Sequence, residues 1–327
     1  VQGSCGREIL SLLEENGYKA EDVFALEHKA PLGTLVSFGE DDELDVYNLD
    51  EFDFSKADAA IFATSDEVSR RYVGKALAKG CKTGDCSKAF FAEEDVPMIA
   101  AGVNDEAVKE AKRGLVSVPS AAVVQMLLPL SEIHRRFGLK RIVVSTYMST
   151  SIYGKEAMDE LFGQVRKIYM NDPLADNQPL PRIACQVFEK QIAFNVIPQV
   201  EEFIGEETAC EWAMNAQAKK ILGGSLKVHA NCAIIPAFIG CGEFVNVECG
   251  TEVDVDEIRK LMKTTKNVVV FDKNVEGGYV TLTDVQGENG IYVSRLRQDA
   301  SVENAFGAWL ITCGPERLRM PWRRLNC

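Results

Sequence analysis

The feature that most restricts the fold of this chain is an alternation of short apolar strands with helices over about its first 140 residues. Strands are expected at 23–26, 36–38, 59–63 and 115–118, and helices at 66–79 (capped by Ser65 and followed by Gly80) and 123–137. Strands that alternate with helices in this way usually pair in parallel, with helices on both faces of the sheet. The pattern therefore predicts an α/β domain with a doubly wound parallel sheet.

The start of the chain carries a weak signal for nucleotide binding. Gly3 and Gly6 form a turn that opens a helix expected at 7–15. Such a turn follows the first strand of a dinucleotide-binding fold, and its free N–H groups can hold a pyrophosphate. Two glycines in a turn are common, however, and the strand ahead of them is absent from this chain. We therefore expect a Rossmann-like domain that lacks its first strand, with Gly3 and Gly6 as its candidate cofactor-binding residues.

The second part of the chain has a different pattern, because its strands cluster. Strands are expected at 141–147, 227–235, 244–249, 268–271, 279–282 and 291–297, and helices at 155–169, 206–222 and 255–262. Clustered strands with a few helices favour an α+β domain whose mixed or antiparallel sheet is covered on one face. We expect a dinucleotide-binding domain at 1–120, an α+β catalytic and dimerisation domain at 121–305, and a C-terminal segment at 306–327 that returns to the first domain.

Charge and cysteine usage narrow the possible partners. The net charge of −13 argues against a nucleic-acid binder and against docking on an anionic membrane. No apolar run is long enough to cross a bilayer. The ten cysteines include no CxxC pair, so no zinc site is expected. Scattered cysteines in a chain of this size favour reduced thiols and a cytoplasmic location.

Several phrases of the sequence together resemble the aspartate-β-semialdehyde dehydrogenase family. They lie, in unbroken order, at 6–10, 34–39, 125–130, 144–147, 154–161, 190–198, 220–223, 293–297 and 301–304. The resemblance runs from Gly3 to about Thr312. It implies the family's two-domain fold, a homodimer formed through the second domain, and NADP as cofactor. It also implies the interconversion of aspartyl phosphate and aspartate semialdehyde in the biosynthesis of lysine, methionine and threonine.

The resemblance assigns catalytic roles to positions that hold other residues here. The family attacks the substrate carbonyl with a cysteine thiolate, which is both a good nucleophile and a good leaving group. By the matching phrases, that position is Ala121. The glutamine after Ser-Thr-Tyr is Met148, the arginine that holds the substrate carboxylate is Ile234, and the acid/base histidine is Cys241. No catalytic position of the family is therefore intact.

The binding positions depart from the family as well. The Glu-Glu-Trp-Lys phrase that contacts substrate and phosphate is Cys210–Ala213, so its first and last residues are Cys210 and Ala213. The phosphate-binding arginine falls on Phe91. The serine and arginine for the adenosine 2′-phosphate fall on about His28 and Ala30. We therefore expect weak NADP binding or none, because the 2′-phosphate has no arginine partner.

Three interpretations fit this sequence. In the first, the chain is a pseudoenzyme that keeps the fold and loses the chemistry, because Ala121 cannot attack a carbonyl. In the second, it is an active dehydrogenase that uses a relocated cysteine, with Cys241 and Cys86 as candidates. In the third, it is an altered sequence of an active family member, which suits a bulky, basic tail at 314–324 where the family has a helix of small residues.

Overall fold

The computed structural model describes residues 1, 3–170 and 182–314, which form two compact units. The first unit holds residues 1–124, and the second begins at Gln125. Within the described residues, no helix is long and apolar enough to cross a membrane. Both units combine helices with β-sheet, and the first contains a parallel sheet, as the sequence pattern predicted.

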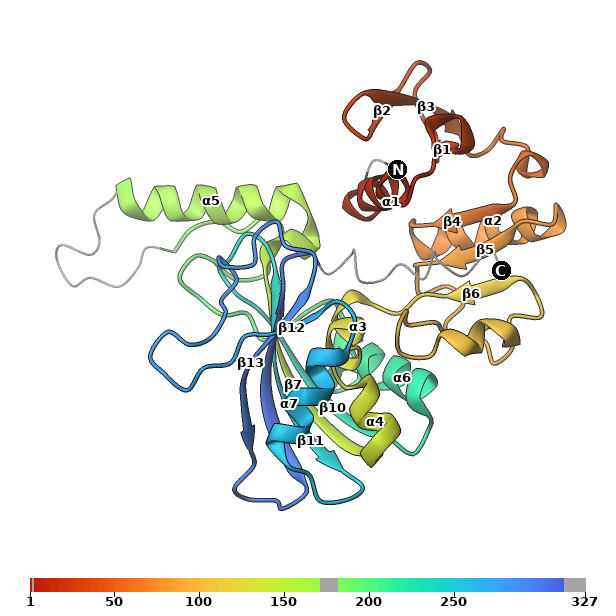
Figure 1. The fold of residues 1–327 in the computed structure, drawn as a ribbon. Coiled ribbons are helices and arrows are strands. Elements are labelled where there is room, and N and C mark those ends of the chain that lie inside the picture. Colours follow the sequence, from red (N-terminus) through yellow and green to blue (C-terminus); the bar gives the residue numbers. More distant parts are fainter. Residues whose placement is uncertain (2, 171–181, 315–327) are drawn as a thin grey trace. The chain divides into compact units, whose positions relative to one another are not determined.

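The first unit contains two separate three-stranded sheets, with orders β1-β3-β2 and β4-β5-β6 (Figure 1). Its elements are α1 (Ser4–Glu15), η1 (Ala20–Asp22), β1 (Ala25–Glu27), β2 (Leu35–Phe38), β3 (Asp42–Asn48), η2 (Phe54–Lys56), β4 (Ala59–Phe62), α2 (Asp66–Ala78), β5 (Lys82–Asp85), η3 (Asp105–Glu110) and β6 (Leu115–Ser117). β1 runs parallel to β3, and β4, β5 and β6 are all parallel, whereas β2 is antiparallel to β3.

Helix α2 shows how local sequence fixes an element of this unit. The Ser65 side chain accepts a hydrogen bond from the Val68 N–H, which satisfies one of the free donors at the helix start. Gly80 follows the helix with a φ of +90°, a conformation that favours glycine. Between these ends, Tyr72 and Val73 are fully buried in a core cluster with Phe62 of β4.

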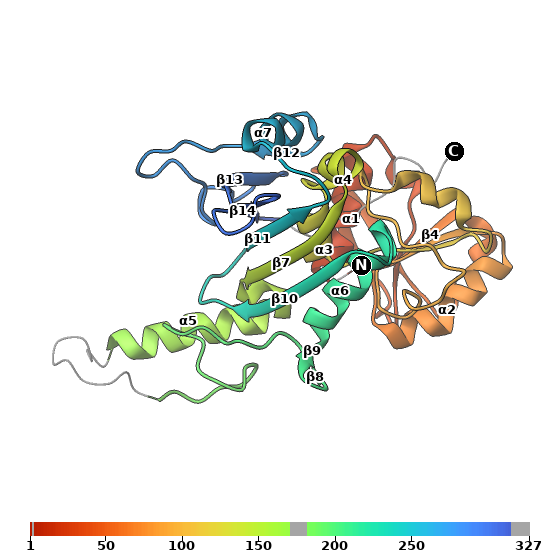
Figure 2. The ribbon, with the colours of Figure 1, turned by 90° about the horizontal axis from the view of Figure 1, so that it is seen from below.

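The second unit is built on a six-stranded sheet of order β10-β7-β11-β14-β13-β12 (Figure 2). Its strands are β7 (Leu139–Met148), β10 (Lys227–Ile234), β11 (Cys241–Cys249), β12 (Val268–Val270), β13 (Ile291–Gln298) and β14 (Ala305–Thr312), with a small hairpin of β8 (Phe203–Ile204) and β9 (Glu207–Thr208) beside it. Its helices are α4 (Ser131–Phe137), η4 (Thr150–Tyr153), α5 (Lys155–Met170), α6 (Ala209–Leu222) and α7 (Val255–Thr264), and α3 (Ala121–Leu127) leads into it. β7 is parallel to β10 and antiparallel to β11, so the sheet is mixed.

The two faces of this sheet differ in polarity and exposure. Along β11, Cys241, Glu243, Val245 and Val247 are buried, whereas Phe244 between them is 40% exposed. Because side chains alternate between faces of a strand, the buried set lies on one face and Phe244 on the other. The buried face is therefore the one that the helices of this unit cover.

Two expectations about the elements were wrong. A single helix at 123–137 is instead two helices, α3 and α4, and the break contains Pro129. Proline has no N–H and its ring clashes with the preceding turn, which ends a helix. The strand expected at 279–282 is absent, since these residues form no regular secondary structure.

The end of the second domain also differs from expectation. β14, at Ala305–Thr312, pairs with both β11 and β13 inside the sheet. Residues 306–312 therefore belong to the second unit, although we expected the segment 306–327 to leave it. Residues 315–327, which include most of the basic tail, lie outside the described part of the chain.

Candidate functional site

Three of the catalytic positions inferred from the sequence lie side by side on the buried face of the six-stranded sheet. Met148 ends β7, and in register it faces Ile234 at the end of β10 and Cys241 at the start of β11. Cys241 in turn faces Thr312 of β14. We call this set, Ile234, Met148, Cys241 and Thr312, the terminal row. All four side chains are buried, so the row is an apolar layer with one thiol and one hydroxyl.

The next row on the same face holds a buried acid. Glu243 faces Thr146 of β7 and Leu310 of β14, and Thr146 faces Cys232 of β10. Glu243 is 0% exposed, and neither carboxyl oxygen has a hydrogen-bond partner in the described structure. Burial, and after it the Cys232 thiol, raises the pKa of Glu243 well above its usual range. Burial therefore favours the protonated, uncharged form of Glu243.

Helix α3 carries Ala121, the position matched to the family's nucleophile, and reaches this face through Gln125. Ala121 is the first residue of α3, and Gln125 lies one turn further along the same helix. The Gln125 Nε2 group donates to the carbonyl oxygens of Cys241 (3.1 Å) and Leu310 (3.2 Å). Its Oε1 atom is buried and has no partner within the described residues. Gln125 thus joins α3 to two strands of the sheet, while Ala121 offers only a methyl group.

Helix α6 is held against β10 by an N-terminal capping box. The Thr208 hydroxyl accepts from the Glu211 N–H (3.4 Å), and the Glu211 carboxylate accepts from the Thr208 N–H (2.8 Å). The other Glu211 oxygen accepts from the Cys232 N–H at 3.0 Å. Burial opposes ionisation of Glu211, but these hydrogen bonds outweigh it and lower its pKa. These hydrogen bonds fix the start of α6, and with it the positions of Cys210 and the buried Ala213.

The thiols of Cys210 and Cys241 are poor nucleophiles. Cys210, Cys232 and Cys241 all carry free thiols. Contact with the Cys232 thiol, together with burial, raises the pKa of Cys210. Burial, and then the nearby Glu243, raises the pKa of Cys241 well above its usual range. A thiolate is the reactive form of cysteine, and the raised pKa values of Cys210 and Cys241 disfavour that form. No group of metal-binding side chains occurs among the described residues.

The candidate cofactor residues of the first unit form only part of a phosphate site. Gly3 is the N-cap of α1 and makes no side-chain cap, so the helix start offers N–H groups to a ligand. Gly6 lies in the first turn of α1, where a Cβ would come within 2.7 Å of the Val1 Cα. Gly6 is therefore required because the backbone of Val1 passes too close to it for a side chain to fit.

The positions matched to the 2′-phosphate contacts do not fit a phosphate. His28 Nε2 lies 3.7 Å from the Asp50 carboxylate, and the Arg71 guanidinium lies 3.2 Å from it. A hydrogen bond from the Tyr72 hydroxyl, and then the Arg71 charge, lowers the pKa of Asp50, so this carboxylate is ionised. A phosphate beside it would meet a negative charge, and Ala30 supplies no cation.

The other candidates of the first unit lie further along its parallel sheet. Phe91 is buried, and its aromatic ring cannot pair with a phosphate. Cys86 directly follows β5, and its backbone N–H donates to the Phe62 carbonyl at 2.9 Å. The candidates thus fall into two groups: Met148, Cys210, Ala213, Ile234 and Cys241 in the second unit, and Gly3, Gly6, His28, Ala30, Cys86 and Phe91 in the first.

Sequence reasoning missed the buried acid. Glu243 lies two residues after Cys241, and this spacing places both side chains on the same face of a strand. The signal was therefore present in the Gly240-Cys-Gly-Glu243 phrase, but the sequence could not show that the face is buried. The anchoring role of Gln125 was missed for the same reason, since both of its partners are more than 100 residues away.

Comparisons with known proteins agree on one family. The family model described as "Semialdehyde dehydrogenase, NAD binding domain" matches residues 1–111, and "Semialdehyde dehydrogenase, dimerisation domain" matches residues 128–312. The chain is 33% identical over 313 residues to an aspartate-semialdehyde dehydrogenase of Rickettsia bellii, covering 95% of this chain and 89% of that protein. It is 32% identical over 313 residues to one of Legionella pneumophila, covering 94% and 87%.

Solved structures give the same result. The fold is similar to aspartate semialdehyde dehydrogenase II of Vibrio cholerae complexed with ASA, with a TM-score of 0.86, 29% identity, and coverage of 97% of this chain and 91% of that one. A probable aspartate-semialdehyde dehydrogenase of Pseudomonas aeruginosa is similar with a TM-score of 0.86, 25% identity, and coverage of 99% and 95%. The likeness therefore extends over both units.

Proposed function

Since this chain belongs to the aspartate-semialdehyde dehydrogenase family, we propose that it is a pseudoenzyme that keeps the family's fold and has lost the family's NADP-dependent dehydrogenation of aspartate semialdehyde. The single observation that carries this proposal is Ala121, a residue without a nucleophilic atom at the position matched to the catalytic cysteine. Removal of a catalytic nucleophile typically lowers the rate on the order of a millionfold.

The terminal row supports the same proposal. Ile234 and Met148 offer no charge to a substrate carboxylate, and each lost charge-assisted hydrogen bond is worth roughly 1.5–3 kcal/mol. Cys241 is buried and its pKa is raised, so it is neither the acid/base that a histidine provides nor a ready thiolate.

A relocated cysteine is the second candidate function. The burial and raised pKa of Cys241 count against it as the nucleophile, because a slow thiolate supply would limit the reaction. Cys86 is partly exposed and remains the stronger candidate of the two. The third interpretation, an altered sequence of an active family member, predicts that reversal of the substitutions restores activity.

For the cofactor, we propose that NADP binds weakly or not at all. The pairing of His28 and Arg71 with Asp50 supports this proposal, as does the lack of a cation at Ala30 and Phe91. Isothermal titration with NADP tests it independently of turnover. Binding in the micromolar range would contradict it.

We further propose that the protein forms a homodimer through the open face of the six-stranded sheet. Tyr147, Phe244 and Trp309 gather on this face, with ring centroids of Phe244 and Trp309 4.6 Å apart. Exposed aromatic groups of this kind favour an interface. Phe244→Ser should weaken the dimer in sedimentation velocity, whereas substitution of the exposed Glu252 should not.

The cytoplasmic location and the lack of nucleic-acid partners stay predictions from composition.

The experiment that tests the main proposal is phosphate-dependent oxidation of aspartate semialdehyde, followed as NADPH formation. We expect no enzyme-like rate for the chain as it stands. Ala121→Cys, Cys241→His and Ile234→Arg combined test whether the framework is otherwise competent, and Ala121→Ser combined with the other two is the matched control. An enzyme-like rate from the unmodified chain would refute the pseudoenzyme proposal, and its loss in Cys86→Ser would then identify the relocated nucleophile.

A further inference from the structure

Sulfur atoms meet where helix α6 packs on strand β10. Cys232 is buried on β10, and its Sγ atom lies 3.7 Å from the Met214 Sδ atom of α6. Cys210 lies four residues before Met214 on the same helix, and side chains with this spacing project from one helix face. Cys210 and Met214 therefore both face Cys232, and the junction between helix and strand holds two thiols.

Hydrogen bonds hold the Cys210 end of α6 beside Cys232. Glu211 directly follows Cys210, and its carboxylate accepts from the Cys232 N–H at 3.0 Å and from the Thr208 N–H at 2.8 Å. The thiols of Cys210 and Cys232 also contact each other through a hydrogen bond. The two sulfur atoms are therefore neighbours before any bond joins them, and one carboxylate ties the helix start to the strand.

The third thiol of this face, Cys241, lies too far from Cys232 to bond with it. Strand β7 runs between β10 and β11, with Cys232 facing Thr146 and Cys241 facing Met148. Neighbouring strands are about 4.8 Å apart, so two strand spacings separate the two cysteines by about 10 Å. A disulfide requires Cα atoms within about 7 Å of each other. Of the other two thiols, Cys232 can therefore bond with Cys210 and not with Cys241.

The two neighbouring thiols differ in their access to solvent. Cys232 is only 3% exposed, whereas Cys210 is partly exposed. A dissolved oxidant therefore reaches Cys210 first, with Cys232 directly behind it. Contact with the Cys232 thiol, and then burial, raises the pKa of Cys210. The reactive thiolate is therefore scarce at neutral pH and becomes more abundant as pH rises.

We propose that Cys210 and Cys232 are a redox-active pair that a peroxide converts into a disulfide between α6 and β10. In the first step the Cys210 sulfur attacks hydrogen peroxide, its O–O bond breaks, and a sulfenic acid and one water form. In the second step the Cys232 sulfur attacks the Cys210 sulfur, the S–O bond breaks, and a second water leaves. The two thiols together lose two electrons and two protons, and the peroxide gains them.

The disulfide would change the stability of the second unit. It would close a loop from residue 210 to residue 232, which restricts the unfolded chain and so favours the folded state. It would also fix Cys210 and Ala213, the two positions matched to the family's substrate and phosphate contacts, against β10. The proposal concerns the thiols alone, so it holds whether or not the chain is catalytically active.

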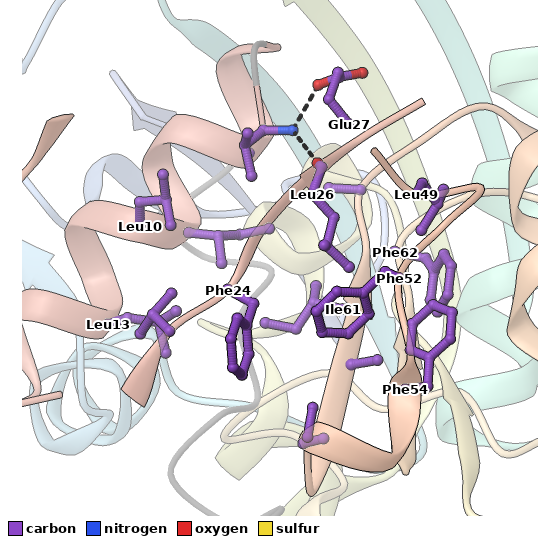
Figure 3. A pocket seen from close by; sticks show the side chains of 18 of the residues that line it. Leu10, Leu13, Phe24, Leu26, Glu27, Leu49, Phe52, Phe54, Ile61 and Phe62 are labelled. Atoms are coloured by element: carbon purple, nitrogen blue, oxygen red, sulfur yellow. Dashed lines mark hydrogen bonds and ion pairs between the residues drawn. The ribbon is translucent and has the colours of Figure 1, made fainter. Parts of the chain in front are cut away.

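Two other thiols show a different environment and serve as controls. The Cys81 Sγ atom donates to the carbonyl oxygens of Phe54 (3.1 Å) and Ala57 (2.8 Å), and Phe54 lines a cavity of about 580 Å³ in the first unit (Figure 3). Cys185 is partly exposed like Cys210, but its sulfur contacts the Gln164 amide at 3.9 Å. Both sulfur atoms thus have oxygen or nitrogen partners, and neither is expected to form a disulfide.

The test treats the full chain with hydrogen peroxide and maps its disulfides by tryptic digestion without reduction. We expect a cross-link between the peptides 191–219 and 228–259, with fragmentation placing it on Cys232 rather than on Cys241 or Cys249. It should form at least about tenfold faster at pH 9 than at pH 7. The oxidised protein should melt about 4 °C or more above the reduced one, and dithiothreitol should reverse the shift.

Variants separate a specific pair from general oxidation. Cys185→Ser should form the cross-link and show the Tm shift as the parent does, whereas Cys210→Ser and Cys232→Ser should show neither. Mapping of the parent decides the question even if Cys232→Ser does not fold. Oxidation of Cys210 to a sulfinic acid without a cross-link would overturn the proposal. So would a cross-link from Cys210 to Cys241 or Cys249, or one that forms only between two chains.

Discussion

Replacement of Glu243 by glutamine should remove a pH dependence from the stability of the second unit. The folded state favours the protonated form of Glu243, because burial raises its pKa well above the usual range. In the unfolded chain a glutamate ionises at about pH 4.3. Below that pH Glu243 is protonated in both the folded and the unfolded state, so its burial carries no ionisation penalty. As pH rises towards the folded pKa, only the unfolded state loses the proton, and the free energy of unfolding falls. Each pH unit in this window lowers the free energy of unfolding by about 1.4 kcal/mol.

Glutamine cannot ionise and has nearly the same shape, so Glu243→Gln should unfold with a flatter pH profile than the parent chain. As pH rises from 5, the difference between the two proteins should grow in favour of the variant, by at most about 1.4 kcal/mol per pH unit. Urea unfolding at pH 5, 6 and 7 measures this difference. Glu252→Gln is the matched control, because Glu252 is exposed. Parallel profiles for parent and Glu243→Gln would refute the reasoning, since Glu243 would then not be held neutral by the fold.

Three further predictions concern the same unit. Gly242→Ala should lower the free energy of unfolding by about 1–3 kcal/mol, measured by urea unfolding, because a Cβ there would overlap the Trp309 ring; an unchanged midpoint would contradict this. Thr208→Ala should cost about 0.5–2 kcal/mol through loss of the α6 capping box, and Thr208→Ser should recover most of it. Iodoacetamide at pH 8 should label the buried Cys241 more slowly than the partly exposed Cys313, as followed by peptide mass spectrometry, and equal rates would contradict its burial.

Much of the fold followed from periodicity, and the failures have physical causes. The helix at 155–169 was predicted because its apolar spacing is local, and it is present as α5. The helix at 123–137 was extended too far because Pro129 was passed over in an otherwise apolar run. β14 was missed because its partners β11 and β13 lie elsewhere in the chain, and pairing of that kind leaves no local signal.

The sequence named the residues of the candidate site but not the burial of the sheet face on which they lie. The matching phrases named Met148, Ile234 and Cys241 as family site positions, and the strand register places these three residues side by side. That Glu243 lies in the next row, buried and without a partner, required the sheet. Burial of a face depends on which helices cover it, and no single segment of sequence carries that information.

Under the proposed loss of activity, the terminal row has a consequence for how mutations could restore it. Its members come from separate strands, yet each packs against the next, so their substitutions are coupled. Ile234→Arg alone would place an uncompensated charge in a buried layer, which is strongly destabilising. Ala121→Cys alone would gain a nucleophile with no acid/base partner. If the proposed loss of activity holds, each single reversal is therefore either destabilising or without effect on the rate, and activity returns only when several of these positions change together.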